Sequence, residues 1–63
     1  DESYQYEYDL PQLTEQQMLE NQDLISEINE RIVYSLDQGT TPKHRWHHRQ
    51  VLKVRLRELK KKL

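Results

Sequence analysis

Residues 37–42, Asp-Gln-Gly-Thr-Thr-Pro, separate two long amphipathic segments and so decide how this chain folds. Gly39 suits the left-handed backbone conformation that ends many helices. Pro42 suits the first position of a helix, because its φ is already helical and its missing N–H would go unpaired there. Thr41 is then the expected N-cap. A connection this short, over about residues 39–41, places two helices antiparallel.

The segment before this turn carries a helix start followed by an apolar stripe. Thr14 and Gln17 have the spacing of a capping box, and Leu13 and Met18 are placed for a hydrophobic staple. The later apolar residues recur at helical spacings, which puts them on one side of a helix. These stripe residues are Met18, Leu24, Ile25, Ile28, Ile32 and Leu36. We therefore expect one helix over about 15–38.

The segment after the turn predicts a second helix over about 42–63, with Leu52, Leu56, Leu59 and Leu63 on one stripe. In an antiparallel pair of helices, the numbers of facing positions add up to a nearly constant value, here 80 or 81. The two stripes meet this condition from Leu36 opposite Arg45, through Ile28 opposite Leu52, to Met18 opposite Leu63. Asn21, opposite Leu59, is a polar residue in this seam of the kind that fixes register or oligomeric state. The expected fold over residues 14–63 is thus all-α, an antiparallel two-helix hairpin with a coiled-coil-like seam.

Residues 1–13 form an acidic arm in which Tyr4, Tyr6 and Tyr8 alternate with polar residues before Pro11. A single strand has no partner and is not stable alone, so we expect the arm to be disordered. Three roles remain open: an acidic linker, a segment that orders on a partner, or a modification site, since residues 8–11 resemble a phosphotyrosine-x-x-Pro pattern. We also expect the arm to fold back onto the second helix or to compete there with a partner.

The charges are sorted along the chain. Residues 1–39 carry ten acidic residues and one basic residue, whereas residues 40–63 carry nine basic residues and one acidic residue. The antiparallel register places Glu20 near Lys60 and Glu27 near Lys53. Exposed pairs of this kind are each worth about 0–1 kcal/mol, so they orient the helices more than they stabilise them.

Several function classes find no support in the sequence. The chain has no Cys, and Gly39 is its only Gly, so there is no cysteine zinc site, disulfide or glycine-rich phosphate loop. Ser3, Ser26 and Ser35 have no His at a triad-like spacing. His44 and His48 share a helical face next to His47, but two ligands do not complete a metal site. We expect no catalysis, no metal and no cofactor.

No apolar run approaches the 18 or so residues of a membrane span, and no signal peptide is evident, so we expect a soluble, intracellular protein that does not enter membranes. The chain begins without Met and stops inside a basic run. This is typical of a fragment of a longer protein.

Six apolar residues lie off the two stripes, and a two-helix seam would leave them exposed. A second apolar face on so small a domain favours docking onto another protein or self-association into a helical bundle, although scattered surface apolar residues are also common. The candidate partner-binding residues are Leu19, Val33, Tyr34, Trp46, Val51 and Val54.

The basic second helix supports an alternative function, the binding of nucleic acid with the acidic half as modulator. Its cations can pair with phosphates, and Trp46 can stack on a base. The same cations would serve equally to neutralise the acidic helix. The candidate nucleic-acid residues are Lys43, Arg45, Arg49, Lys53, Arg55 and Arg57.

Residues 18–28, MLENQDLISEI, resemble the first helix of the SSXT family, which are transcriptional coactivators of SWI/SNF chromatin remodellers. The family pattern has one more residue between Leu19 and Asn21, and its second helix is largely uncharged rather than basic. The resemblance implies a nuclear, chromatin-associated setting. We accordingly expect a protein–protein interaction module within a larger nuclear transcription or chromatin assembly.

Overall fold

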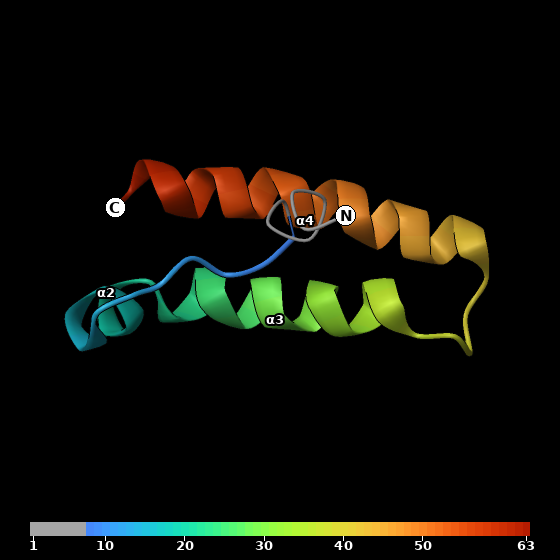
Figure 1. Ribbon diagram of the computed structural model, residues 1–63, viewed down its shortest axis with the longest axis horizontal. Coiled ribbons are helices and arrows are strands. Elements are labelled where there is room, and N and C mark those ends of the chain that lie inside the picture. The colour runs from blue at the N-terminus through green and yellow to red at the C-terminus, as the bar shows by residue number, and fades with distance from the viewer. Residues whose placement is uncertain (1–7) are drawn as a thin grey trace.

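The computed structural model describes residues 8–63, and all regular secondary structure in this range is helical (Figure 1). Helix α2 spans Glu15–Glu20, α3 spans Gln22–Leu36 and α4 spans Pro42–Lys61. The predicted all-α class is therefore confirmed. The second predicted helix ends two residues earlier than expected.

Both predicted helix starts are confirmed. The backbone N–H of Gln17 donates to Thr14 Oγ1 at 3.2 Å, and the backbone N–H of Thr14 donates to Gln17 Oε1 at 3.0 Å, which is a complete capping box. At α4 the backbone N–H of His44 donates to Thr41 Oγ1 at 3.3 Å, with Pro42 at the first helical position. These contacts satisfy backbone donors that have no partner inside the helix.

Asn21 divides the first predicted helix into two, so the expectation of one continuous helix over 15–38 is wrong. Its backbone, at φ −118° and ψ 26°, is not helical, and its side-chain Nδ2 donates to the carbonyl of Gln17 at 2.8 Å. Asn side chains compete in this way with the helical hydrogen-bond pattern. Helix α2 consequently lies at an angle to α3, and Met18, expected in the seam, is exposed.

The connection between α3 and α4 is closed by side chains rather than by a left-handed glycine. No residue in 8–63 has a positive φ, so the role predicted for Gly39 is wrong, and α3 ends at Leu36 instead of residue 38. Asp37 Oδ1 accepts the Gly39 N–H at 2.8 Å, a turn that Asp residues commonly form. Arg45 Nη1 then donates to the carbonyls of Asp37 and Thr40, at 3.1 and 2.7 Å.

The core lies between α3 and α4, which are side by side and run in opposite directions (Figure 1). Four apolar side chains are buried, Ile28 from α3 and Leu52, Leu56 and Leu59 from α4. The predicted stripes supply all four. The ends of the stripes do not pack as expected, since Leu36 is 63% exposed.

Residues 8–13 cover one side of this core. They form a non-helical segment that runs beside α3 and α4, with Tyr8, Leu10 and Leu13 packed against the buried cluster (Figure 1). The expectation of a disordered arm is therefore wrong for residues 8–13, because a pair of helices leaves apolar area open along its seam. Lys53 Nζ lies 5.7 Å from the ring centroid of Tyr8, as expected for an arm folded back onto the second helix. Tyr4 and Tyr6 lie outside the described residues.

Candidate interaction surfaces

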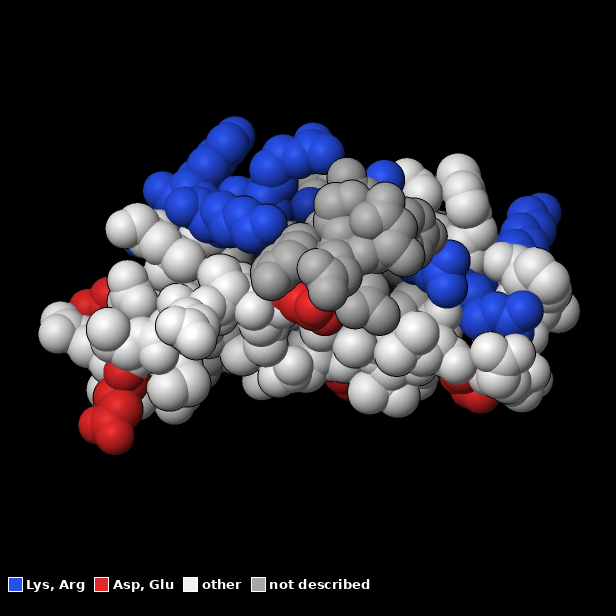
Figure 2. All heavy atoms as spheres, in the orientation of Figure 1, with Lys and Arg blue, Asp and Glu red and all other residues white. Residues whose placement is uncertain are grey.

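The two signs of charge occupy different helices. Figure 2 shows Lys and Arg side chains gathered over α4, along the upper edge of the molecule, and Asp and Glu side chains on the side of α2 and α3. This separation follows from the sorting of charge along the sequence, because α4 contains nearly all the basic residues. The two halves therefore present chemically different surfaces.

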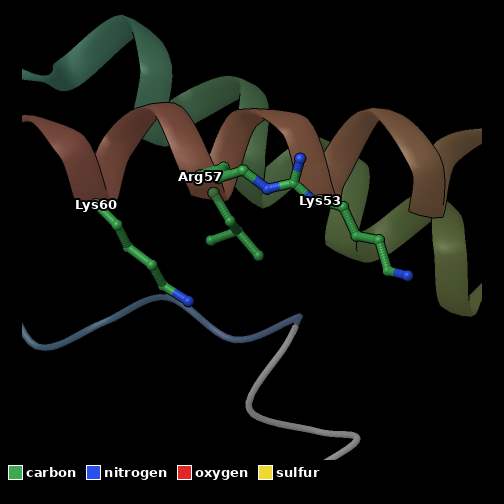
Figure 3. A pocket seen from close by; sticks show the side chains of 4 residues that line it. Lys53, Arg57 and Lys60 are labelled. Carbon is green, nitrogen blue, oxygen red and sulfur yellow. The ribbon is translucent and has the colours of Figure 1, made fainter.

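A basic hollow of about 190 Å³ lies on α4 beside the arm. It is lined by Lys53, Leu56, Arg57 and Lys60, and we call it the α4 hollow. Figure 3 shows the side chains of Lys53 and Lys60 extending on the side of α4 where the arm runs. Within residues 8–63, Arg57 and Lys60 have no hydrogen-bond or ion-pair partner. In the described part of the chain, the charges of Arg57 and Lys60 in the α4 hollow are thus not compensated by a carboxylate.

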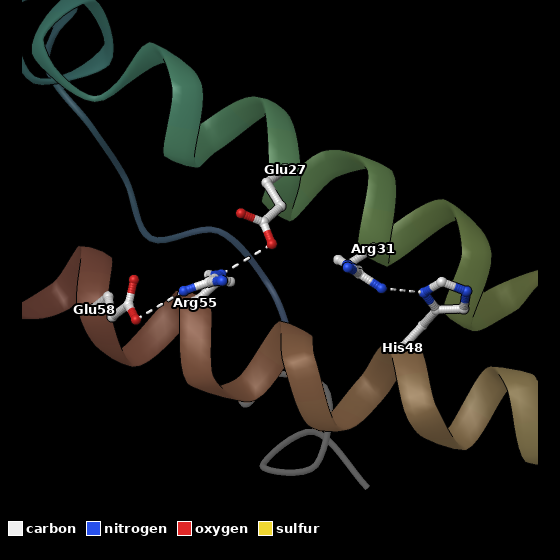
Figure 4. Close-up of polar contacts among 5 residues, drawn as sticks. All are labelled: Glu27, Arg31, His48, Arg55 and Glu58. Atoms are coloured by element: carbon white, nitrogen blue, oxygen red, sulfur yellow. Dashed lines mark hydrogen bonds and ion pairs between the residues drawn. The ribbon is translucent and has the colours of Figure 1, made fainter.

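The opposite side of the seam is bridged by an ion-pair chain. Arg55 Nε lies 2.9 Å from Glu27 Oε2, and Arg55 Nη1 lies 2.9 Å from Glu58 Oε1 (Figure 4). The hydrogen bond and negative charge of Glu27, with the charge of Glu58, raise the pKa of Arg55 above its usual value. The prediction that Glu27 pairs with Lys53 is wrong, because positions 53 and 55 lie about 160° apart around a helix of 3.6 residues per turn.

The other predicted ion pair, between Glu20 and Lys60, does not form in the described part of the chain. Glu20 Oε1 instead accepts a hydrogen bond from Gln16 Nε2 at 3.1 Å, one turn earlier in α2. The bend at Asn21 directs α2 away from the line of α3. Lys60 therefore does not pair with Glu20 and instead lines the α4 hollow.

His48 joins the two helices nearer the connecting loop. Arg31 Nη1 donates to His48 Nδ1 at 2.7 Å, and the ring centroids of His48 and Tyr34 are 5.1 Å apart (Figure 4). Since Arg has only donors, the His48 ring must be neutral, with its proton on Nε2. Burial lowers the pKa of His48, as do the charge of Arg31 and the neighbouring His47 and His44. Residues 8–63 contain no group of three side chains arranged to hold a metal ion.

An apolar groove with acidic edges runs along the outer side of α2 and α3. Two shallow hollows of about 540 and 550 Å³ meet at Ser26 and together form what we call the α3 groove. Its apolar lining consists of Met18, Leu19, Ile25, Val33 and Tyr34, and its carboxylates are Glu15, Asp23 and Glu30. Leu19 is 68% exposed and Val33 is 63% exposed, so this groove lies outside the core.

The six candidate partner-binding residues do not form one face. Leu19, Val33 and Tyr34 lie together in the α3 groove. Trp46 is 62% exposed in a separate hollow near the loop end of α4. Val54 is exposed elsewhere on α4, and Val51 is half-buried. Met18 was missed as a groove residue, because helical periodicity assigned it to the seam.

The six candidate nucleic-acid residues also divide. Arg45 and Arg55 are engaged with loop carbonyls and carboxylates, and Arg49 makes a further intramolecular interaction. Lys53 and Arg57 line the α4 hollow. Lys43 lies beside Trp46 in the other hollow of this helix. Lys60, a further cation of the predicted basic helix, also lines the α4 hollow.

Comparison with protein families, with characterised proteins and with solved structures finds no match to this chain. The resemblance to the SSXT family therefore rests on residues 18–28 alone. None of the helices in the described range combines the length and the apolar character needed to span a bilayer.

Proposed function

We propose that this chain is a protein–protein interaction module, an antiparallel helical hairpin with a coiled-coil-like seam. It docks through the α3 groove onto a basic amphipathic helix of another protein, within a larger nuclear transcription or chromatin assembly. The observation that carries this proposal is the α3 groove itself, an exposed apolar surface edged by carboxylates.

The spacing of the groove residues on α3 suits a helical partner. Ser26 and Val33 are seven residues apart, the repeat at which one helix presents a continuous line to another, and Leu19 adds apolar area from α2. Ser26 is small and sits where the two hollows meet, so a partner backbone can approach closely there. An amphipathic helix laid into an apolar groove is a recurring mode of recognition.

The charge of the groove specifies the partner. Glu15, Asp23 and Glu30 edge the apolar lining, and within residues 8–63 none of the three takes part in an ion pair. Interface charges of one sign steer and orient a partner of the opposite sign, and they repel like charge. The groove is therefore suited to a helix with basic flanks.

The nuclear setting is supported by the same part of the chain. Residues 18–28, which resemble the first SSXT helix, include Met18, Leu19 and Ile25 of the groove lining. A helix of this kind in a coactivator would present its outer face to other subunits. The chromatin context is thus proposed for the surface that carries the resemblance.

Binding to synthetic peptides tests the proposal. A fluorescent amphipathic helical peptide of Leu and Lys should bind the chain, whereas the matching peptide of Leu and Glu should not. Val33→Ser should weaken binding of the Leu/Lys peptide about tenfold, which corresponds to about 1.4 kcal/mol. The matched control is Val54→Ser, an exposed valine outside the groove, which should leave the affinity unchanged. Equal binding of both peptides, or equal effects of both substitutions, would refute the proposal.

Self-association is distinguished by sedimentation at several concentrations. Since α4 is itself a basic helix, a second copy is one possible occupant of the groove. A dimer that Val33→Ser dissociates would identify that occupant as a second copy. A chain that stays monomeric but binds the Leu/Lys peptide would assign the groove to a different protein.

A further inference from the structure

An exposed aromatic ring lies on the same face of α4 as the cations of the α4 hollow. Trp46, Lys53, Arg57 and Lys60 follow one another at spacings of seven, four and three, which places them along one stripe of α4. At 1.5 Å per residue, the stripe is about 21 Å long, and Trp46 precedes Lys53 by about 10 Å. The indole ring is 62% exposed, so it is available to a ligand.

The positive charges of this stripe are not paired with carboxylates among residues 8–63. Lys53 contacts the ring of Tyr8, while Arg57 and Lys60 have no polar partner in residues 8–63. Arg45 and Arg55, by contrast, are held by loop carbonyls and by carboxylates. Among residues 8–63, no acidic side chain lines the α4 hollow. A ligand with several negative charges would gain from Arg57, Lys60 and the nearby ammonium group of Lys53 at once.

We propose that this stripe binds single-stranded nucleic acid. Lys53, Arg57 and Lys60 pair with successive phosphates, and Trp46 stacks on a base. Basic side chains along a backbone combined with an aromatic stacking platform are the means by which single strands are bound with little sequence preference. A duplex keeps its bases stacked and cannot use the ring in this way. An acidic peptide would use the cations but has no base to place on Trp46.

The stripe is distinct from the α3 groove, because no residue is shared between them. Its arm-side position also explains how the acidic half could modulate binding. Residues 8–13 run beside the α4 hollow, with Tyr8 against Lys53 (Figure 3). A nucleic-acid strand bound along this stripe would therefore lie next to residues 8–13.

The test measures fluorescence anisotropy of a labelled short oligo(dT) with the full chain over a range of salt concentrations. For single strands the slope of log affinity against log salt is about −0.7 for each neutralised phosphate. The chain should give a slope near −2, and Lys60→Gln should reduce its magnitude by about 0.7. Lys62→Gln is the matched control, because it removes the same charge two residues later, about 160° away around the helix. This control should leave the slope unchanged.

Two further readouts separate the site from general attraction between opposite charges. Adding oligo(dT) to saturation should quench the fluorescence of Trp46, the only tryptophan of the chain. The quenching should follow the same titration curve as the anisotropy. Polyglutamate at the same charge concentration should compete poorly. An unquenched Trp46, equal losses from Lys60→Gln and Lys62→Gln, or effective competition by polyglutamate would each overturn the proposal. Circular dichroism of both variants checks that α4 is intact, and none of these outcomes bears on the α3 groove.

Discussion

Replacing Ile28 with Ala tests the core between α3 and α4. Ile28 is fully buried in one cluster with Leu52, Leu56 and Leu59. The substitution removes three carbons, or about 2.4 kcal/mol at about 0.8 kcal/mol for each buried methylene. The cavity left behind adds to this, giving a loss of about 2–5 kcal/mol. At about 0.05–0.15 kcal/mol per residue, a chain of this length has a total stability of only about 3–9 kcal/mol.

Urea denaturation followed by circular dichroism would measure this loss, with Leu36→Ala as the matched control. Leu36 belongs to the same predicted stripe but is 63% exposed, so its substitution should change the free energy of unfolding by less than about 0.5 kcal/mol. Similar costs for the two variants, or a cost below about 1 kcal/mol for Ile28→Ala, would refute the described packing of α3 on α4. The stripe would then face a partner instead.

Three other substitutions test the polar bridge, the arm and the helix start. The pKa of His48 is lower in the folded chain than in the unfolded chain, so as the pH falls the unfolded state takes up a proton on His48 before the folded state does. The free energy of unfolding should therefore decrease as the pH drops through about 6.5, the ordinary pKa of histidine. His48→Asn keeps an acceptor for Arg31 but does not titrate. Between pH 7.5 and 5.5, the urea midpoint of this variant, measured by circular dichroism, should therefore fall less than that of the unsubstituted chain. An equal fall in the two proteins would contradict this explanation. Leu10→Ser should lower the free energy of unfolding by about 1–2 kcal/mol, because Leu10 packs against the core, and no loss in the same assay would make the arm a free tail. Thr14→Ala should cost about 1 kcal/mol and speed amide exchange at Gln17, whereas unchanged exchange would argue against the cap.

Residues 8–13 of the arm are part of the fold and also lie beside the basic stripe. One side of the seam is bridged by Arg55 with Glu27 and by Arg31 with His48, and the other side is covered by residues 8–13. A truncation that starts at residue 14 would therefore remove apolar cover from the core. Binding studies of the basic stripe should use the full chain for this reason.

The sequence by itself determined the helices and most of the core. Helix starts depend on side chains within three residues of the first turn, so Thr14 and Thr41 could be identified as caps without a structure. Helical periodicity also selected Ile28 and Leu52 as facing residues, and both are buried. Leu19, Val33 and Tyr34 were likewise identified as apolar residues outside the seam. All of these properties depend on neighbours within one or two helical turns.

Tertiary structure decided how the two sides of the seam are closed and which surfaces remain. The choice of Arg55 over Lys53 as partner of Glu27 depends on the position of a second helix. The same holds for Leu10, whose burial requires the groove that α3 and α4 create together. The bend at Asn21, by contrast, has a local cause in the hydrogen bond from its side chain to Gln17, which helical periodicity alone does not reveal. Helical periodicity specifies which way a side chain points from its own helix. It does not specify what lies opposite, because that is set by residues distant in sequence.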